Sequence, residues 1–476
     1  MKQSLNSSLK DRKNIRWTVL VLVSFTMLCA YYLTDALAPL ELRLETSLSW
    51  SATDYGFYTG AYGWFNIFLL MLVFGGMILD KAGVKFTGIL AIVIMLAGAG
   101  IKYWAISGHV ASEMFTFKIG QWTGFEVKQS ALVAGLGFAV FGVGAEMFGI
   151  TANKAVIRWF KGRELALAIG LNTSVGRIGT ALAMFTPVPL VSMTKNLSTP
   201  VILSVLLLCI GLITFICFSF LDKKLDKDEI ENQEEKEEFK FSDIREIAKI
   251  KAFWIITVLC VLFYSAVFPF IKYATQLIVQ KFGVSDEFAG NIPALLPFGA
   301  LILTPVFGSL YDKKGKGATI MIIGSVLLLL VHLLFAVPSL NNLFIAIGLV
   351  LILGVAFSLV PSAMWPSVAK IIPEKRLGTA YSITFWVQNW GLMLVPMLIG
   401  YVLDKYCITG KEIRMIDGIE KEITLYSFTV PMLIFACFGA LAIIFAFWLK
   451  KEDAKKGYGL EKANIDETGT LCEMGG

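Results

Sequence analysis

Charged side chains are scarce in this sequence, and histidine is scarcer still. Asp, Glu, Lys and Arg make up 16% of the 476 residues, whereas 56% are hydrophobic. A soluble globular domain carries about 25% charged residues, so the composition excludes an ordinary soluble domain. The two histidines, His109 and His332, are too few and too far apart to predict a metal site. A Gly-rich loop ending in Lys-Ser or Lys-Thr is absent, which excludes a P-loop ATPase, and we expect no cofactor.

Long apolar segments fill most of the chain. A helix needs about 20 apolar residues to cross a bilayer, and twelve such segments follow one another. The predicted spans are Trp17–Leu40, Tyr55–Leu79, Phe86–Ser107, Ala131–Ile157, Leu165–Val191, Thr199–Leu221, Ala252–Val279, Phe288–Leu310, Ala318–Val337, Leu343–Ala369, Leu377–Leu403 and Tyr426–Leu449. We therefore predict an all-α protein that lies in the lipid bilayer for most of its length.

Basic residues are divided unevenly between the predicted loops. When the N-terminus, the loops after even-numbered spans and the C-terminal tail are placed on one face, that face holds most of the 42 Lys and Arg. The positive-inside rule then places both termini in the cytoplasm. The net charge of +6 has the same origin and predicts no nucleic-acid partner. Because only Cys407 of the seven cysteines reaches an outer loop, no outer disulfide can form within one chain.

The chain divides into two halves of six predicted spans each. Between them lies a run of mixed charge, including Asp-Lys-Lys-Leu-Asp-Lys-Asp-Glu, which is typical of a solvated linker with some amphipathic helix. The first span is too long for a signal peptide and follows several basic residues, so we expect it to be an anchor. The predicted parts are an N-terminal bundle at 1–221, a charged cytoplasmic linker at 222–251, a C-terminal bundle at 252–449 and a cytoplasmic tail at 450–476.

An internal repeat follows the second span of each half. Residues 76–85 read Gly-Met-Ile-Leu-Asp-Lys-Ala-Gly-Val-Lys, and residues 308–316 read Gly-Ser-Leu-Tyr-Asp-Lys-Lys-Gly-Lys. We expect the first glycine of each copy to allow close helix packing and the second to form a tight turn. The aspartates are expected to ion-pair across the cytoplasmic side and hold it closed; two ordinary charged turns are the alternative. The candidate gating residues are Asp80, Gly83, Lys85, Asp312 and Gly315.

Two charges lie alone near the middle of predicted spans. Glu146 is twelve residues from Arg158, and Arg177 is twelve residues from Leu165, at the two ends of one short loop. At the helical rise per residue, both lie roughly 18 Å deep on antiparallel neighbours. A charge at that depth costs on the order of 3 kcal/mol. The two could hold the ends of a zwitterion, or they could form an ion pair that ties two helices together.

The repeated loop resembles the signature of the major facilitator superfamily, and the resemblance covers the whole chain. It implies two six-helix bundles related by a pseudo-twofold axis, a central site at mid-membrane, alternating access, and a transporter rather than an enzyme. Shorter strings resemble the branch that contains the animal lysosomal dipeptide uniporter. These strings are Tyr-Leu-Thr-Asp at 32–35, Gly-Trp-Phe-Asn at 63–66, Arg-Trp-Phe-Lys-Gly-Arg-Glu-Leu at 158–165, Ser-Val-Gly-Arg-Ile-Gly at 174–179, Val-Phe-Pro-Phe-Ile at 267–271, Leu-Gly-Thr-Ala-Tyr at 377–381 and Gln-Asn-Trp-Gly at 388–391.

In that branch an acid on the fourth helix holds the dipeptide amino group, and an arginine on the fifth helix holds the carboxylate. Glu146 and Arg177 occupy the matching positions, so the resemblance implies a dipeptide or another small zwitterion as substrate. One alternative is an organic-anion carrier in which Glu146 only balances Arg177. Another is a sensor or scaffold, against which the two intact gate loops argue. The acidic di-leucine sorting signal of the animal members is not found at 1–13, so we expect the cell (inner) membrane.

Further polar side chains inside the spans are candidates for substrate binding. Asp35 is expected near the outer mouth, where it could bind a cation or an amine, or cap a helix end. Lys272 is expected to extend to the membrane interface. Tyr381, Gln388 and Asn389 are expected to share one helix face, although hydrogen bonding between helices is the alternative for each uncharged residue. The candidate substrate-binding residues are Glu146, Arg177, Tyr381, Gln388, Asn389, Trp365, Asn66 and Asp35.

Two predicted outer loops, 108–130 and 406–425, are longer than a connection between spans needs. The second contains Asp-Gly between β-prone arms at 412–423, which predicts a β-hairpin. We expect these loops to form a lid or a surface for an accessory protein. The protein is otherwise expected to be a monomer.

Overall fold

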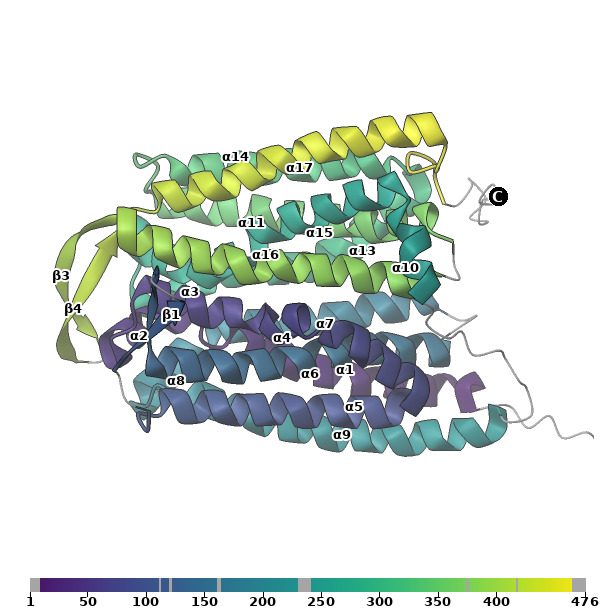
Figure 1. Ribbon diagram of the computed structural model, residues 1–476, viewed down its shortest axis with the longest axis horizontal. Coiled ribbons are helices and arrows are strands. Elements are labelled where there is room, and N and C mark those ends of the chain that lie inside the picture. The colour runs from purple at the N-terminus through teal and green to yellow at the C-terminus, as the bar shows by residue number, and fades with distance from the viewer. Residues whose placement is uncertain are drawn as a thin grey trace, which may run out of the picture.

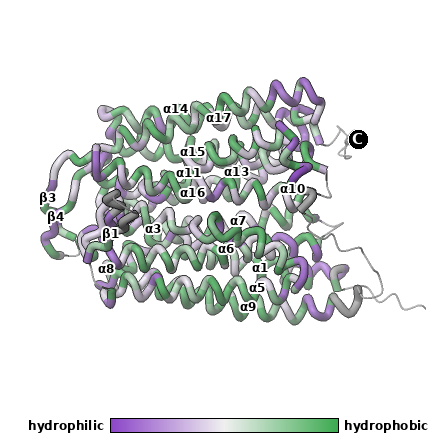
Figure 2. Tube along the Cα trace, in the orientation of Figure 1, coloured by the Kyte–Doolittle hydropathy of each residue, from purple (hydrophilic) through white to green (hydrophobic). Residues whose placement is uncertain are grey.

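The computed structural model describes residues 9–110, 113–119, 122–160, 164–229, 241–373, 376–416 and 418–464. Its helices run side by side in two bundles, one from each half of the chain (Figure 1). Apolar residues occupy the middle of the helices, and hydrophilic residues gather at their two ends (Figure 2). We call the end that carries the strands the hairpin side and the opposite end the termini side. The predicted all-α membrane architecture is confirmed.

The first bundle is built from the helices of the first half. Its described α-helices are α1 (Lys13–Asp35), α2 (Glu41–Leu48), α3 (Ala52–Gly60), α4 (Trp64–Phe68), α5 (Met71–Ile106), α6 (Gln129–Phe160), α7 (Leu165–Phe185), α8 (Pro187–Thr194) and α9 (Thr199–Glu229). Short 3-10 helices precede or connect them at η1 (Leu9–Asp11), η2 (Ala38–Leu40) and η3 (Ala61–Gly63).

The second bundle repeats this plan with fewer breaks. After α10 (Phe241–Ala248) in the linker, its described helices are α11 (Lys251–Phe282), α12 (Asp286–Ala289), α13 (Asn291–Lys314), α14 (Gly317–Ala336), α15 (Leu343–Ile371), α16 (Leu377–Tyr406) and α17 (Thr429–Lys456). Across the described residues, ten helices are long and apolar enough to cross a membrane, and α7 with α8, bent by 41°, provides an eleventh crossing.

The twelfth crossing is found because the chain reverses within α5, at Gly83. The backbone there has φ 78° and ψ 173°, a conformation that only glycine adopts readily. A Cβ added to Gly75 would lie 2.7 Å from Met147 of α6. A Cβ added to Gly144 of α6 would lie 2.5 Å from the carbonyl oxygen of Ala91. Residues 75 and 91 lie equally far before and after Gly83, and both pack against the same part of α6. The chain therefore passes this level of α6 twice, and the twelve predicted crossings are confirmed.

The second crossing, predicted as one continuous helix, is broken into α3, η3, α4 and the first part of α5. It meets α16 so closely that a Cβ on Gly60 would lie 2.4 Å from the carbonyl oxygen of Met393. Asp404 of α16 accepts hydrogen bonds from the backbone N–H groups of Ala52 (3.2 Å) and Thr53 (2.6 Å). This carboxylate caps the N-terminus of α3 from the other bundle, so the two bundles are joined tightly on the hairpin side.

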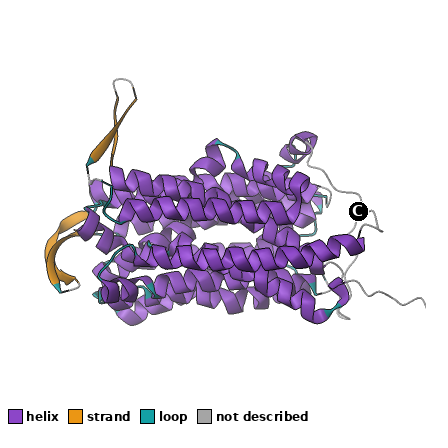
Figure 3. Ribbon diagram, turned by 90° about the horizontal axis from the view of Figure 1, so that it is seen from below, coloured by secondary structure: helices purple, strands orange, loops and turns teal. Residues whose placement is uncertain are grey.

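Both long loops on the hairpin side form antiparallel β-hairpins (Figure 3). Strand β3 (Ile408–Ile416) pairs with β4 (Ile419–Tyr426), and Gly418 in the turn has φ 85°. The hairpin predicted from the Asp-Gly pair is therefore confirmed, although Asp417 itself lies outside the described residues. Strand β1 (Met114–Ile119) pairs with β2 (Trp122–Lys128) in the other loop, where the sequence predicted no strands.

The β3–β4 hairpin belongs to the second half but contacts the first bundle at α2. The Lys421 ammonium donates to the carbonyl oxygen of Thr46 (3.3 Å). The backbone N–H of Thr424 donates to the Glu45 carboxylate (2.8 Å). A small buried apolar cluster completes the contact and consists of Leu42, Ile416 and Ile423. The hairpin thus links the two bundles outside the crossings.

The first bundle extends past its predicted boundary at residue 221. Helix α9 continues to Glu229, and the buried Asp222 side chain accepts hydrogen bonds from Arg158 and Trp159, each at 2.9 Å. Asp222, the first acid of the mixed-charge run, is therefore not exposed to solvent, because it pairs with Arg158 at the end of α6. Helix α10 corresponds to the helix expected in the linker, whereas residues 230–240 lie outside the described residues.

The segment after α17 was predicted to be a cytoplasmic tail, and its first part packs on the second bundle. The Leu460 side chain is fully buried, and its carbonyl oxygen accepts from the backbone N–H of Gly317 (2.8 Å). The Asn464 amide donates to the Asp312 carboxylate (2.7 Å). Residues 457–464 therefore cover the second copy of the repeated loop.

The four glycines of the repeat differ in what they do. A Cβ on Gly76 or Gly308 would meet nothing within 4 Å, so the expectation that these two allow close helix packing is wrong in this conformation. Gly83 and Gly315 do form the turns, with φ 78° and 65°. At Gly315 an added Cβ would also lie 2.4 Å from the backbone of Lys462, because the tail lies against this turn.

Gly83→Ala tests the turn. Alanine fits the space, since nothing lies within 4 Å, but it opposes the positive φ at a cost of about 1–3 kcal/mol. We expect a lower midpoint of thermal unfolding in detergent. Gly76→Ala is the matched control, because this helical position is equally open and has no positive φ. It should leave the midpoint unchanged or raise it slightly. Equal effects of the two substitutions would contradict the role of Gly83.

Candidate functional site

Glu146 lies at the interface between the two bundles and is held by a tyrosine of the broken second crossing. A Cβ on Gly142, one turn earlier in α6, would lie 2.4 Å from the carbonyl oxygen of Tyr62. This close approach lets the Tyr62 hydroxyl donate to the Glu146 carboxylate at 3.0 Å. Asn389 of α16 approaches the same carboxylate from the second bundle. The half-buried acid is therefore partly solvated by protein groups and still has capacity to accept further hydrogen bonds.

Arg177 faces the same interface from α7 and is surrounded by aromatic rings. Its guanidinium carbon lies 4.6 Å from the ring centre of Phe357 and 5.6 Å from those of Phe268 and Tyr31. Helix α7 can approach α1 this closely because residue 179 is glycine: an added Cβ would lie 2.2 Å from the carbonyl oxygen of Leu28. Phe268 and Phe357 come from the second bundle, on α11 and α15.

The two charges do not form an ion pair with each other. No carboxylate among the described residues lies within 4.0 Å of the Arg177 guanidinium, and Glu146 is paired with a hydroxyl instead. Arg177 contacts the ring of Tyr31 and Glu146 contacts the hydroxyl of Tyr62, so each charge lies against a different aromatic residue of the first bundle. The alternative that they tie α6 to α7 by a salt bridge is therefore wrong in this conformation.

Two asparagine amides near Glu146 have unused acceptors. Asn389 and Asn66 are buried, and neither side-chain oxygen has a hydrogen-bond partner among the described residues. Their amide nitrogens donate to backbone carbonyl oxygens of Phe385 (2.9 Å) and Tyr62 (3.5 Å). A buried acceptor without a donor costs free energy, so these oxygens favour a ligand that brings N–H groups.

The other uncharged candidates lie elsewhere in the second bundle. The Tyr381 hydroxyl donates to the carbonyl oxygen of Trp365 (3.2 Å), and the two rings are 5.8 Å apart. Gln388 accepts from the thiol of Cys260 on α11 (3.5 Å), whereas Asn389 points to the first bundle. The prediction that Tyr381, Gln388 and Asn389 share one face stays a prediction, because positions seven and eight residues apart lie on one stripe of a helix even though these side chains contact different neighbours.

On the hairpin side, Asp35 closes the interface through an ion pair. The Lys272 ammonium of α11 lies 2.5 Å from the Asp35 carboxylate at the end of α1. Fully buried Lys102 donates to the carbonyl oxygen of Leu33 (3.1 Å), and both lysines lie over the ring of Phe138. The expectation that Lys272 extends to the membrane interface is wrong. With Asp35 engaged in this pair, its role in substrate binding stays a prediction.

The candidate gating aspartates are paired within their own bundles. Asp80 lies 2.6 Å from Lys154 of α6, and Asp312 accepts from Asn464 of the tail. Lys85 follows the Gly83 turn on the termini side. The expected ion pairs of Asp80 and Asp312 across the termini side therefore stay a prediction. They would form in a conformation in which that side is closed. Among the described residues, no group of three or more His, Cys, Asp or Glu is arranged to hold a metal ion.

Five residues around the site were not singled out from the sequence: Tyr31, Tyr62, Phe268, Phe357 and Lys102. The signal that identified Glu146, one charge inside an apolar segment, also applies to Lys102 and could have found it. No comparable signal marks the aromatic residues, because the chain contains 36 phenylalanines and 14 tyrosines. Their role follows only from which helices meet.

The sequence matches one known family over most of its length. The profile described as Major Facilitator Superfamily matches residues 20–396 and 271–467. The lysosomal dipeptide transporter MFSD1 of Bos taurus is 28% identical over 404 residues, which cover 82% of this chain and 80% of the relative. That of Gallus gallus is 34% identical over 282 residues, which cover 56% and 62%.

Solved structures share the fold at low identity. The inward open conformation of the xylose transporter XylE from E. coli has a TM-score of 0.67 at 13% identity, covering 91% of this chain and 95% of that one. The nucleoside transporter NupG has a TM-score of 0.66 at 15% identity, covering 92% and 99%. A bacterial homolog of the human lysosomal transporter Spinster, in an inward-facing and unoccupied conformation, has a TM-score of 0.65 at 15% identity, covering 93% and 98%.

Asp35→Asn tests closure of the hairpin side. The substitution leaves the Lys272 ammonium between the bundles without its counter-charge, so we expect the hairpin side to open more often. A cysteine replacing buried Ala38 on this side should react faster with a membrane-impermeant maleimide. Glu422→Gln is the control, because it breaks an ion pair whose two side chains are each 61% exposed. Equal labelling rates in both variants would argue against closure of the hairpin side by Asp35.

Proposed function

Because the chain belongs to the Major Facilitator Superfamily and is a multi-pass membrane transporter, we propose that it carries dipeptides or other small zwitterions. In this proposal Glu146 binds the substrate ammonium and Arg177 binds the substrate carboxylate. Both residues face the interface between the bundles, where a major facilitator transporter binds its substrate near mid-membrane.

One observation carries the proposal: an acid on α6 and a guanidinium on α7 both face the interface between the bundles, and they form no ion pair with each other. Charges inside a membrane span are expensive and are kept where they serve a ligand pathway. Among the described residues, Arg177 has ring contacts but no hydrogen bond or ion pair, so its N–H donors are available to a carboxylate. A zwitterion supplies the missing counter-charge to both groups at once.

The surroundings of Glu146 support an ammonium at this end. An ammonium has three donors and no acceptor. The Glu146 carboxylate and the unpartnered amide oxygen of Asn389 both offer acceptors from opposite bundles. The MFSD1 relatives are named as dipeptide transporters, and a dipeptide carries one ammonium and one carboxylate. An anion carrier would leave these acceptors without a donor, so no observation favours that alternative.

The orientation and partners are part of the same proposal. The uneven distribution of Lys and Arg supports cytoplasmic termini, and we propose the cell (inner) membrane, whereas the MFSD1 relatives are named lysosomal. The bundles are joined on the hairpin side, so the substrate would reach this conformation from the cytoplasm. Asp80 and Asp312 would exchange their present partners for partners across the termini side when that side closes. The two hairpins remain the proposed surface for an accessory protein.

Arg177→Lys tests the carboxylate end. Lysine keeps the charge but lacks the planar fork that binds a carboxylate through two parallel hydrogen bonds. We expect a severe loss of uptake of labelled dipeptides into proteoliposomes. Arg414→Lys on the β3–β4 hairpin makes the same chemical change away from the interface and should transport normally. Normal uptake by Arg177→Lys would remove Arg177 from the proposed site.

Glu146→Gln tests the ammonium end. The variant loses a charge-assisted hydrogen bond, on the order of 1.5–3 kcal/mol, or roughly ten- to a hundredfold in affinity for a free dipeptide. An N-acetylated dipeptide brings no positive charge and should lose much less. Competition assays with both ligands on wild type and variant measure this difference. An anion carrier would instead bind equally well or better without the acid, and equal losses for both ligands would end the zwitterion proposal.

A further inference from the structure

The Arg177 guanidinium is positioned by rings that belong to both bundles. Tyr31 comes from α1 of the first bundle, whereas Phe268 and Phe357 come from α11 and α15 of the second. The contact with Phe357 is the shortest of the three, at 4.6 Å. No carboxylate among the described residues approaches the guanidinium. The rings are therefore the groups that determine where this charge points.

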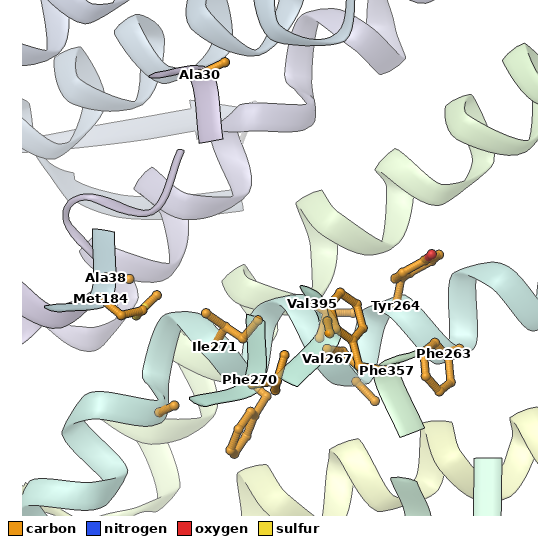
Figure 4. Packing of buried hydrophobic residues seen from close by; sticks show 14 of the residues in the cluster. Ala30, Ala38, Met184, Phe263, Tyr264, Val267, Phe270, Ile271, Phe357 and Val395 are labelled. Carbon is orange, nitrogen blue, oxygen red and sulfur yellow. The ribbon is translucent and has the colours of Figure 1, made fainter. Parts of the chain in front are cut away.

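These rings are themselves fixed by neighbouring aromatic side chains. Phe268 stacks on Tyr264 with ring centres 5.1 Å apart and planes inclined by 15°. Phe357 meets Phe268 edge to face at 5.6 Å and Tyr264 at 6.3 Å. Phe357 of α15 lies beside Val267 and Tyr264 of α11 (Figure 4). Phe357 is buried, so it has little freedom to turn away from Arg177.

A guanidinium can bind a ring and a carboxylate at the same time. Rings attract its flat faces, whereas its N–H groups point outward in the plane. Ring contacts therefore restrict the guanidinium without using the donors that a carboxylate needs. An arginine held in this way loses little further freedom when a carboxylate binds, which favours tight and selective binding.

We propose that Phe357, supported by Phe268, is a positioning residue that gives the site its selectivity for substrates with a free carboxylate. The proposal rests on the proposed function of Arg177 and adds that the second bundle takes part in carboxylate recognition. The second bundle supplies no charge to this subsite. It acts through the rings that orient a charge belonging to the first bundle.

Phe357→Leu tests this role in the full-length protein. Leucine keeps an apolar side chain but has no ring face for the guanidinium. The measurement is the ratio of inhibition constants of a dipeptide and of its C-terminal amide, which lacks the carboxylate charge. Wild type should prefer the free acid. In Phe357→Leu this preference should fall roughly two- to thirtyfold, the range of a cation–π contact, while affinity for the amide stays nearly constant.

Two further variants separate positioning from general packing. Phe357→Trp restores a ring face and should recover the preference for the free acid. Phe270→Leu removes an equally buried ring from α11, but Phe270 packs on His332 and Phe335, away from Arg177. It should lower thermal stability without changing the ratio.

The outcomes distinguish this inference from the proposed function. An unchanged ratio in Phe357→Leu, or an equal fall in Phe270→Leu, overturns the positioning role while leaving Arg177 as the carboxylate ligand. A wild-type protein that binds acid and amide equally overturns both. A folded Phe357→Trp variant with the same ratio of inhibition constants as Phe357→Leu also contradicts the inference, because a ring at position 357 would then not cause the preference for the free acid.

Discussion

Every charge inside the membrane must find a compensating group, and this constraint organises the interface between the bundles. Glu146 is compensated by a tyrosine hydroxyl, Arg177 by aromatic faces, and Lys102 by a carbonyl oxygen and a ring. Each solution requires a particular neighbour. The second crossing is broken into short helices at the level where Tyr62 reaches α6, and α11 and α15 bring their rings against α7. The break in the second crossing thus places Tyr62 at Glu146, and the meeting of α11 and α15 with α7 places two rings at Arg177.

The sequence predicted the features that depend on local composition. Twelve crossings follow from the length of apolar segments, the Gly83 turn from the repeat, and the β3–β4 hairpin from Asp-Gly. The two buried charges stood out because charge is rare. Contacts between distant segments left no such mark. The sequence between β1 and β2 is Gly-Gln, a weaker hairpin signal than Asp-Gly, and no hairpin was predicted from it. Phe357 differs from other phenylalanines only through its place beside Arg177.

The two halves share a plan but divide the work of the site. In the proposed site the first bundle contributes both charges, Glu146 and Arg177, whereas the second contributes the rings of Phe268 and Phe357 and the Asn389 amide. On the termini side of the first bundle, Asp80 and Asp222 form ion pairs with basic residues of α6. In the second bundle the tail lies at the equivalent place, where Asn464 donates a hydrogen bond to Asp312. A repeated architecture therefore holds a site whose two sides are chemically different, as a zwitterion requires.

The β3–β4 hairpin extends from the second bundle and rests on α2 of the first. These contacts must break before the hairpin side can open, although none of them touches Glu146 or Arg177. Changes to the hairpin residues that make these contacts therefore alter how long the protein dwells in each conformation and leave its choice of substrate intact. Turnover and selectivity become separable traits, so that related proteins can evolve a faster or slower carrier through a surface loop while inheriting the same specificity.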